Sequence, residues 1–155
     1  MDDMPILTRR RIEAEFAKGI YEEMKAELGE ESARRILTNA IVKLARASAA
    51  GFAQRAPDGT PSLDHFRAIQ SLWTAEDALR TEVVKSTETE FHFNVVRCRY
   101  SEMYREMGLA ELGAILSCNR DSAFCEGYDP KLKLERSQTL MGGASHCDFR
   151  YRREP

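Results

Sequence analysis

The spacing of the apolar residues changes partway along the chain, and this change constrains the fold more than any other feature. Between Thr8 and Leu28 apolar residues recur at every fourth position, the spacing of an α-helix, and Gly29 ends the pattern. A second alanine-rich segment, from Glu30 to about Ala53, carries apolar pairs at the same spacing. The first part of the chain is therefore expected to be a pair of helices.

Turn-forming residues separate this pair of helices from the rest of the chain. The segment from Ala56 to Pro61 is rich in turn-forming residues, and Ser62 follows at the position expected for a helix N-cap. A third helix is expected to begin there and to extend to about Trp73. Two segments rich in Val, Phe, Thr and Tyr, Leu79 to Val84 and Glu90 to Tyr100, predict strands that pair with each other.

Helical spacing then returns from Tyr100 to Ser117, with a possible break at Gly108. Leu132 to Leu140 and Cys147 to Tyr151 are predicted as two further strands. The expected class is α+β, with a helical N-terminal half followed by a small, mainly antiparallel sheet with one inserted helix. We expect residues 1–155 to form a single domain, with a helical part over about 8–76 and a sheet-bearing part over about 78–155.

The charge distribution excludes some classes of partner. The chain has 23 basic and 25 acidic residues, well mixed along its length, so there is no broad positive field to attract nucleic acid. It has no apolar run long enough for a membrane helix, and its start, Met1 to Pro5, lacks the pattern of a signal peptide. We therefore expect no nucleic acid or membrane partner, a cytoplasmic location and cysteines that are free thiols.

Candidate chemistry begins in the strand Glu90 to Tyr100. Period-two alternation places Phe91, Phe93 and Val95 on one face, and the other face receives a largely polar set. The members of that set are His92, Asn94, Val96, Cys98 and Tyr100. These polar residues would either line a site or simply face solvent.

The next candidate is the run Cys118-Asn119-Arg120-Asp121, which is expected to follow a helix end as a tight turn. A cation stabilises a thiolate, whereas a carboxylate or burial disfavours it. Arg120 would therefore activate Cys118 and Asp121 would oppose it. A cysteine at a helix end also commonly serves only for packing.

The third candidate is the segment from Gly142 to Arg150, in which two glycines precede His146, Cys147 and Asp148. Adjacent strand residues point to opposite faces, so His146 and Asp148 would share a face and could form a hydrogen-bonded pair, with Cys147 on the other. The glycines leave open whether the strand has begun at His146.

Cofactor and metal motifs are scarce. The sequence contains no nucleotide-binding glycine-rich loop, no Gly-x-Ser-x-Gly and no His-Glu-x-x-His, so we expect no cofactor. Three cysteines and a histidine raise the alternative of zinc, but the cysteine spacings match none of the usual ligand pairs. We therefore expect no metal.

The ordered set Phe93-x-Val-x-x-Cys98, Cys118-x-x-Asp121 and Gly143-x-x-x-Cys147-Asp148-Phe149 resembles the pattern of the L-2-amino-thiazoline-4-carboxylic acid hydrolase family. The resemblance implies hydrolysis of a small cyclic amidine or related heterocycle that bears a carboxylate: water adds to the ring carbon and the ring opens to a carbamoyl amino acid. Cys125 lies outside this pattern.

That chemistry needs a nucleophile or activated water, a proton donor and a cation for the carboxylate. Our hypothesis assigns these roles within the resembling segments, with either cysteine or an activated water as the attacking group. The candidates are Cys118 or Cys147 as nucleophile, Asp121, Asp148 and His146 for proton transfer, Arg120 or Arg97 as carboxylate anchor, and His92, Asn94 and Cys98 around the substrate.

Two other functions remain open. The same residues could form the pocket of a non-enzymatic domain that binds or senses a small molecule. Alternatively, the helices Thr8 to Leu28 and Glu30 to Ala53 could serve chiefly to associate subunits, since an apolar stripe can be buried either on the chain's own sheet or on a neighbouring copy. For an enzyme of this size, a homo-oligomer is a reasonable expectation.

Overall fold

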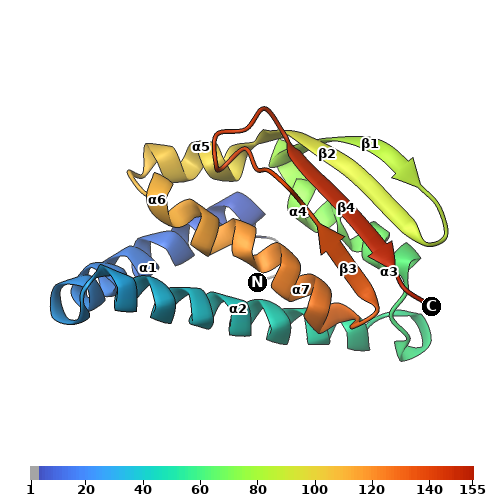
Figure 1. The fold of residues 1–155 in the computed structure, drawn as a ribbon, viewed down its shortest axis with the longest axis horizontal. Helices are drawn as coiled ribbons and strands as arrows, with labels where there is room; N and C mark the ends of the chain where they lie inside the picture. Colours follow the sequence, from blue (N-terminus) through green and yellow to red (C-terminus); the bar gives the residue numbers. More distant parts are fainter. Residues whose placement is uncertain (1–3) are drawn as a thin grey trace.

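The N-terminal half of the protein is helical, as the spacing predicts. A computed structural model describes residues 4–155; residues 1–3, part of the start in which no signal peptide is expected, lie outside it. Helix α1 spans Ile6–Leu28 and α2 spans Glu30–Gln54, joined by Gly29 at a φ of 84°. A positive φ is readily adopted only by glycine, so the chain can reverse there without strain. Figure 1 shows the two helices meeting in a turn at the lower left, from which α2 runs along the bottom of the molecule.

The predicted third helix is present in two pieces. A short 3-10 turn, η1 (Pro57–Gly59), precedes α3 (Leu63–Ile69), and the Ser62 hydroxyl caps α3 by accepting a hydrogen bond from the His65 amide at 3.1 Å. Helix α4 (Ser71–Thr74) and the turn η2 (Ala75–Asp77) then lead into the sheet.

The sheet has four antiparallel strands in the order β1-β2-β4-β3. Their bounds are Leu79–Ser86 for β1, Glu90–Cys98 for β2, Leu132–Glu135 for β3 and Cys147–Arg153 for β4. The predicted pairing of the first two strands is confirmed. The prediction of a strand from Leu132 to Leu140 is wrong beyond Glu135, because the following residues leave the sheet as a loop. The predicted strand to Tyr100 ends at Cys98, where the sulfur caps a helix by accepting from the Ser101 amide.

The helical segment inserted between β2 and β3 is longer than predicted. It contains α5 (Arg99–Glu106), α6 (Ala110–Gly113), a π-helical turn η3 (Ala114–Cys118) and α7 (Asn119–Tyr128), and Gly108 breaks it at a φ of 71°, as expected. The prediction that Cys118 begins a tight turn is wrong. The Asn119 amide bonds to the Ala114 carbonyl, so the helix continues through a wider turn rather than ending.

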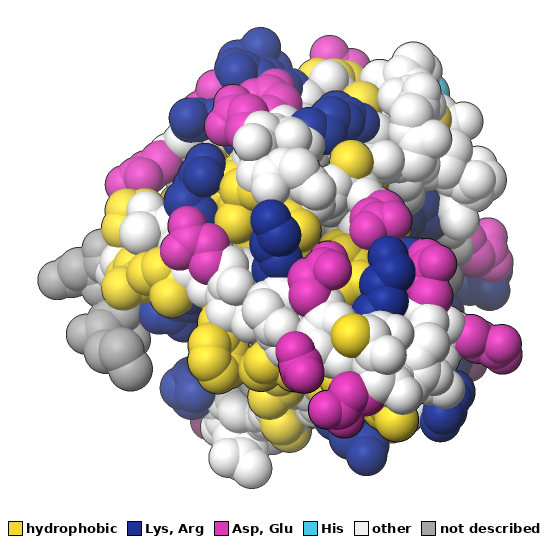
Figure 2. All heavy atoms as spheres, turned by 90° about the vertical axis from the view of Figure 1, so that its left-hand side faces the viewer, with side chains coloured by type: hydrophobic (Ala, Val, Ile, Leu, Met, Phe, Trp, Pro, Cys, Tyr) yellow, Lys and Arg dark blue, Asp and Glu magenta, His cyan; other side chains and the backbone are white. Residues whose placement is uncertain are grey.

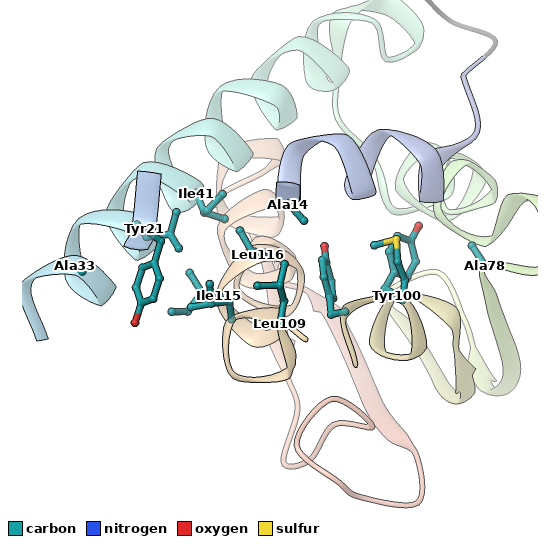
Figure 3. Packing of buried hydrophobic residues seen from close by; sticks show 13 residues of the cluster. Ala14, Tyr21, Ala33, Ile41, Ala78, Tyr100, Leu109, Ile115 and Leu116 are labelled. Carbon is teal, nitrogen blue, oxygen red and sulfur yellow. The ribbon is translucent and has the colours of Figure 1, made fainter. Parts of the chain in front are cut away.

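Two clusters of buried side chains hold the helices and the sheet together. One lies between α1, α2, α5 and η3, with Tyr21 and Ala33 toward one end and Tyr100 and Ala78 at the other (Figure 3). The second packs α3, α7 and the end of α2 against one face of the sheet (Figure 1). At its centre the rings of Phe93 and Phe149 stack at 4.9 Å, on neighbouring strands. The α+β class with its helical N-terminal half is confirmed.

A bulge in β2 changes which side chains face the helices. Phe91, Phe93 and Val95 are buried, as the alternation predicts. Thr81 of β1 pairs with Val95 and the preceding Arg80 pairs with Arg97, so Val96 is an extra residue on β2. The bulge reverses the alternation, and Cys98 packs against both buried clusters. The prediction that Cys98 and Tyr100 share a face with His92 and Asn94 is therefore wrong.

None of the helices in residues 4–155 combines the length and the hydrophobicity that a span of a lipid bilayer requires.

The contact between α2 and α7 can be tested with one methyl group. A Cβ at Gly127 would lie 2.8 Å from the Cα and carbonyl oxygen of Arg46, which are backbone atoms and cannot move aside alone. We expect Gly127→Ala to lower the free energy of unfolding by about 1–3 kcal/mol. Gly51→Ala, in α2 and open apart from the end of the Arg55 side chain, should raise it by about 0.5–1 kcal/mol. Urea denaturation measures both, and equal effects would contradict close packing at Gly127.

Candidate functional site

Three cysteines from three separate elements converge on the helix-facing side of the sheet. Cys98 ends β2, Cys118 ends the π-helical turn and Cys147 begins β4. The charge that either Cys98 or Cys147 would carry acts on the pKa of Cys118, so the three thiols lie within electrostatic range of one another. We call Cys98, Cys118 and Cys147 the thiol cluster. The structure thus brings together three of the predicted site residues.

An ion pair borders the thiol cluster. Asp121 lies three residues after Cys118 on the continuing helix, and residues at this spacing share a helix face. The Asp121 carboxylate accepts a hydrogen bond from Nη1 of Arg136 at 2.6 Å, while Nη2 of Arg136 donates to the Cys118 carbonyl at 3.2 Å. The Arg136 guanidinium also lies over the Phe149 ring, 5.0 Å from its centre. Arg136 therefore joins α7 to the sheet beside the thiols.

The thiols of the cluster are protonated at neutral pH. Burial raises the pKa of the Cys118 thiol to about 12, and the charge of Asp121 adds to the shift. Burial also raises the pKa of Cys98 and of Cys147. None of the three is therefore a preformed thiolate. Attack by any of them requires either a base that removes the thiol proton or a cation, brought by the ligand, that stabilises the thiolate.

Asp121 is the group best placed for proton transfer. Burial raises the pKa of its carboxyl group, and the charge and hydrogen bond of Arg136 oppose the shift. Its side chain nevertheless keeps 34% of its surface exposed, so a proton can exchange with solvent. Asp121 combines a pKa raised by burial, closeness to Cys118 and access to water, which are features that a general base can use.

A loop packs on the thiol cluster at Cys147. Residues 136–146 connect β3 to β4, and the Leu140 amide donates to the sulfur of Cys147 at 3.2 Å. Arg105 of α5 donates to the Leu140 carbonyl at 3.0 Å, and Met141 packs on Gly113. Cys147 is buried, whereas Cys98 and Cys118 are partly exposed.

The structure does not bring His92, Asn94 or Arg97 to the thiols. His92 and Asn94 point to the opposite face of the sheet, where His92 lies 3.7 Å from Glu90 and the Asn94 side-chain oxygen accepts from Arg150. The Arg97 guanidinium is bound by Glu102 at 3.0 Å and by Asp77 at 3.4 Å. All three side chains have partners that account for their positions without a substrate.

His146 and Asp148 hold the loop instead of binding each other as predicted. Asp148 accepts hydrogen bonds from the amides of Ser137 and Gln138 at 2.9 and 3.0 Å and from the Ser137 hydroxyl. Burial alone would raise the pKa of Asp148, but these bonds outweigh it and lower the pKa. His146 contacts the side chains of Gln138 and Ser145. Because β4 begins at Cys147, His146 lies outside the strand.

Arg120 lies on the side of α7 that faces α1. Its Nε donates to the Leu116 carbonyl at 2.7 Å, and its Nη2 lies 3.2 Å from Glu13, which also binds Arg10. Burial lowers the pKa of Arg120, and the nearby charge of Arg10 adds to the effect. The charges of Arg136, Arg10 and Arg120 all act on Asp121, so Asp121 lies in a cationic surrounding.

Arg10, Glu13 and Arg136 are missing from the sequence-based set of site residues. Arg136 falls inside the segment predicted as strand, and nothing in its local sequence marks it. Arg10 and Glu13 belong to a helix whose spacing indicates only packing, and their contact with Arg120 depends on the tertiary fold. Within residues 4–155, no group of three or more His, Cys, Asp and Glu side chains is arranged to hold a metal ion.

Comparison with known proteins identifies both a family and a fold. The sequence profile described as L-2-amino-thiazoline-4-carboxylic acid hydrolase matches residues 9–151. No curated protein matches the sequence significantly.

Two solved structures share the fold at low sequence identity. The phenol-responsive sensory domain of the transcription activator PoxR, crystallised with phenol, has a TM-score of 0.55 and 14% identity over 87% of this chain and 71% of that one. Subunit 3 of a trafficking protein particle complex from Naegleria fowleri, covalently bound to palmitic acid, has a TM-score of 0.52 and 10% identity over 96% of both chains.

The protonated state of the thiols predicts slow alkylation. At pH 8 a thiol with a pKa of about 12 is ionised in only about one molecule in 10⁴, against about one in ten for an unfolded cysteine. We expect Cys118 in the native chain to react with iodoacetamide at least about 10²-fold more slowly than in urea. Its rate should still rise with each pH unit above 9, where an ordinary thiol levels off. Peptide mass spectrometry measures this, and a native rate at pH 7 equal to that in urea would contradict the burial.

Proposed function

This chain belongs to the L-2-amino-thiazoline-4-carboxylic acid hydrolase family, and on that basis we propose that it hydrolyses a small carboxylate-bearing cyclic amidine at the thiol cluster. The observation that carries the proposal is the meeting of Cys118, Asp121 and Arg136 beside Cys98 and Cys147. The predicted family pattern supplies Cys98, Cys118, Asp121 and Cys147, which come from distant parts of the sequence and gather at one place in the fold.

In the proposed reaction Cys118 is the nucleophile and Asp121 is its base. The thiol proton passes to Asp121 as the sulfur bonds to the ring carbon between the two ring heteroatoms. That carbon then releases one ring heteroatom, which takes the proton from Asp121. Water next adds to the same carbon, the bond to Cys118 breaks, and the thiol is protonated again. The net reaction consumes one water and gives a carbamoyl amino acid.

The raised pKa of Cys118 suits a substrate that brings its own positive charge. A protonated amidine placed beside the sulfur would offset the burial that keeps the thiol neutral, because a nearby cation favours a thiolate. The substrate carboxylate needs a cation, and the charges of Arg136 and Arg120 both act on Asp121 beside Cys118. Either guanidinium would bind the carboxylate in exchange for its present acidic partner, Asp121 for Arg136 and Glu13 for Arg120. Arg97, the other predicted anchor, is held by Glu102 and Asp77.

A set of matched variants tests the proposal with 2-amino-thiazoline-4-carboxylate and related cyclic amidines. We expect Cys118→Ser and Asp121→Asn each to lower kcat/KM by about 10²-fold or more, the range of a lost nucleophile or base. Cys125→Ser is the control: this buried thiol only donates to the Leu132 carbonyl at 3.1 Å, and a hydroxyl can do the same. Its kcat/KM should stay within about threefold of the parent.

The same variants separate the alternative mechanisms. Full activity of Cys118→Ser with loss in Cys147→Ser would transfer the nucleophile to Cys147. Full activity of both, with loss in Asp121→Asn, would replace the covalent step by water that Asp121 activates. Loss of activity to a chelator would indicate a metal enzyme, and activity on none of the amidines would reject the hydrolase.

Ligand sensing without turnover is the second candidate, and two observations favour it. A phenol-responsive sensory domain shares the fold, and the thiols of the cluster are neutral, as they would be in a pocket that only binds. Under this candidate, aromatic or heterocyclic carboxylates should raise the melting temperature and remain intact. The shift should be absent in Arg136→Met and retained in Cys125→Ser. Consumption of the ligand at ordinary enzyme rates would exclude this candidate.

A further inference from the structure

Arg10 and Arg120, on different helices, share a single carboxylate near Asp121. Arg10 of α1 donates from Nη1 to both oxygens of Glu13, at 3.0 and 2.8 Å, and Nη2 of Arg120 on α7 donates to one of them at 3.2 Å. The side chains of Arg10 and Arg120 are only 12% and 18% exposed, whereas that of Glu13 is 40% exposed. Two positive charges therefore face one negative charge in a place that is largely removed from water.

The two guanidiniums keep hydrogen-bond donors that no protein group uses. Within residues 4–155, Nε and Nη2 of Arg10 and Nη1 of Arg120 have no hydrogen-bond partner, and none of these atoms is fully buried. A largely buried charge is unfavourable unless an opposite charge and hydrogen bonds balance it. Burial lowers the pKa of Arg120 and the charge of Arg10 adds to the effect, as expected where positive charge is in excess. The pair is therefore short of one anion.

The pair lies within electrostatic range of the thiol cluster. Arg120 precedes Asp121 on α7, and the charges of both Arg10 and Arg120 act on Asp121. Tyr100 of α5 packs under the first half of α1 (Figure 3), and the charges of Arg10 and Cys98 both act on its hydroxyl. A ligand held by the pair through its anionic group would therefore have Asp121 as its neighbour.

We propose that Arg10 and Arg120 form a clamp for the carboxylate of the small ligand of the thiol cluster, which takes the place of Glu13. Glu13 shows that one carboxylate can reach both guanidiniums at once, and the planar donors of arginine suit a carboxylate better than those of lysine. Because Glu13 is partly exposed, it can turn to water when a ligand replaces it. That this ligand is a substrate rests on the proposed function, whereas the clamp itself rests on these charges and contacts.

Arg136 is less free to serve as the carboxylate anchor. Its Nη1 donates to Asp121 at 2.6 Å and its Nη2 to the Cys118 carbonyl at 3.2 Å, and its guanidinium lies over the Phe149 ring. To bind a ligand, Arg136 would have to leave Asp121, and the proposed base would lose its cation. The clamp binds the carboxylate and leaves this ion pair intact.

The clamp should select a singly charged carboxylate. Figure 2 shows basic and acidic side chains interspersed on the end of the molecule where α1 meets α2, so no broad positive surface attracts anions there. Attraction then depends on the clamp, which is short of one negative charge while Glu13 remains nearby. A monoanion balances this charge, whereas a dianion such as sulfate exceeds it.

Isothermal titration calorimetry of the full chain tests the clamp without turnover. The probe is thiazole-4-carboxylate, which carries the carboxylate but no amidine to hydrolyse, and 4-methylthiazole is the matched compound without the charge. We expect 4-methylthiazole to bind at least about tenfold more weakly than the probe, because it makes no hydrogen bonds to the charged donors. Arg10→Gln should weaken binding of the probe by about tenfold or more for the same reason. Arg11→Gln is the matched control, because the Arg11 side chain is 45% exposed and pairs with Glu106 at 3.5 Å, and it should change the dissociation constant by less than about twofold.

Glu13→Gln should have the opposite effect. It keeps the size of the side chain and removes the charge that competes with the ligand, so the probe should bind about threefold to tenfold more tightly. A substitution that only loosened the fold would not tighten binding. Circular dichroism shows whether Arg10→Gln remains folded.

Several results would overturn the clamp. They are no binding of the probe, binding that Arg10→Gln leaves unchanged, weaker binding in Glu13→Gln, and sulfate or 4-methylthiazole binding as tightly as the probe. The clamp and the proposed hydrolysis can also fail separately. Turnover of cyclic amidines that withstands Arg10→Gln would reject the clamp alone, whereas binding of the probe that depends on Arg10, in a chain that hydrolyses none of them, would reject the hydrolase alone.

Discussion

A strand presents its side chains to alternate faces of a sheet, and the place of Cys98 in the thiol cluster depends on how that alternation is interrupted in β2. Phe91, Phe93 and Val95 face the helices, and in an uninterrupted strand the next residue on their side would be Arg97. The bulge at Val96 puts Cys98 there instead and turns Arg97 outward to Glu102. The bulge thus decides whether a thiol or a guanidinium lies on the helix-facing side at the end of β2.

The thiol cluster combines features of a catalytic site with features of a closed core. Its cysteines have raised pKa values and Cys147 is held by the loop of residues 136–146, yet the adjoining Asp121 is paired with a cation and open to water. Thiols kept protonated in this way are less prone to oxidation, because oxidation follows thiolate character and exposure. The same fold occurs in a phenol-responsive sensory domain and in a trafficking subunit covalently bound to palmitic acid. Proteins with this fold therefore bind quite different ligands.

The sequence predicts the architecture better than it predicts the site. Four-residue spacing, the cap at Ser62 and the alternation in β2 are local signals, and the helices and strands that they predict are present. The bulge at Val96 depends on how β2 pairs with β1, and the helix continues past Cys118 through a wider turn. No local pattern in the sequence reveals either feature. The partnership of Arg136 with Asp121 joins residues 15 positions apart across a helix and a loop. Predictions for Asp148 and His146 assumed that sharing a face meant contact, but the neighbouring loop offers both groups stronger partners.

The wide turn from Ala114 to Cys118 acts as a one-residue insertion within a helix. Each residue of an α-helix advances the side-chain direction by about 100°, and the wide turn absorbs one such step. If the same residues formed a regular α-helix instead, α7 would be rotated relative to α6 by up to that angle. Cys118 and Asp121 would then point away from Cys98 and Cys147. The constellation therefore depends on the width of one helical turn as much as on the identity of its residues.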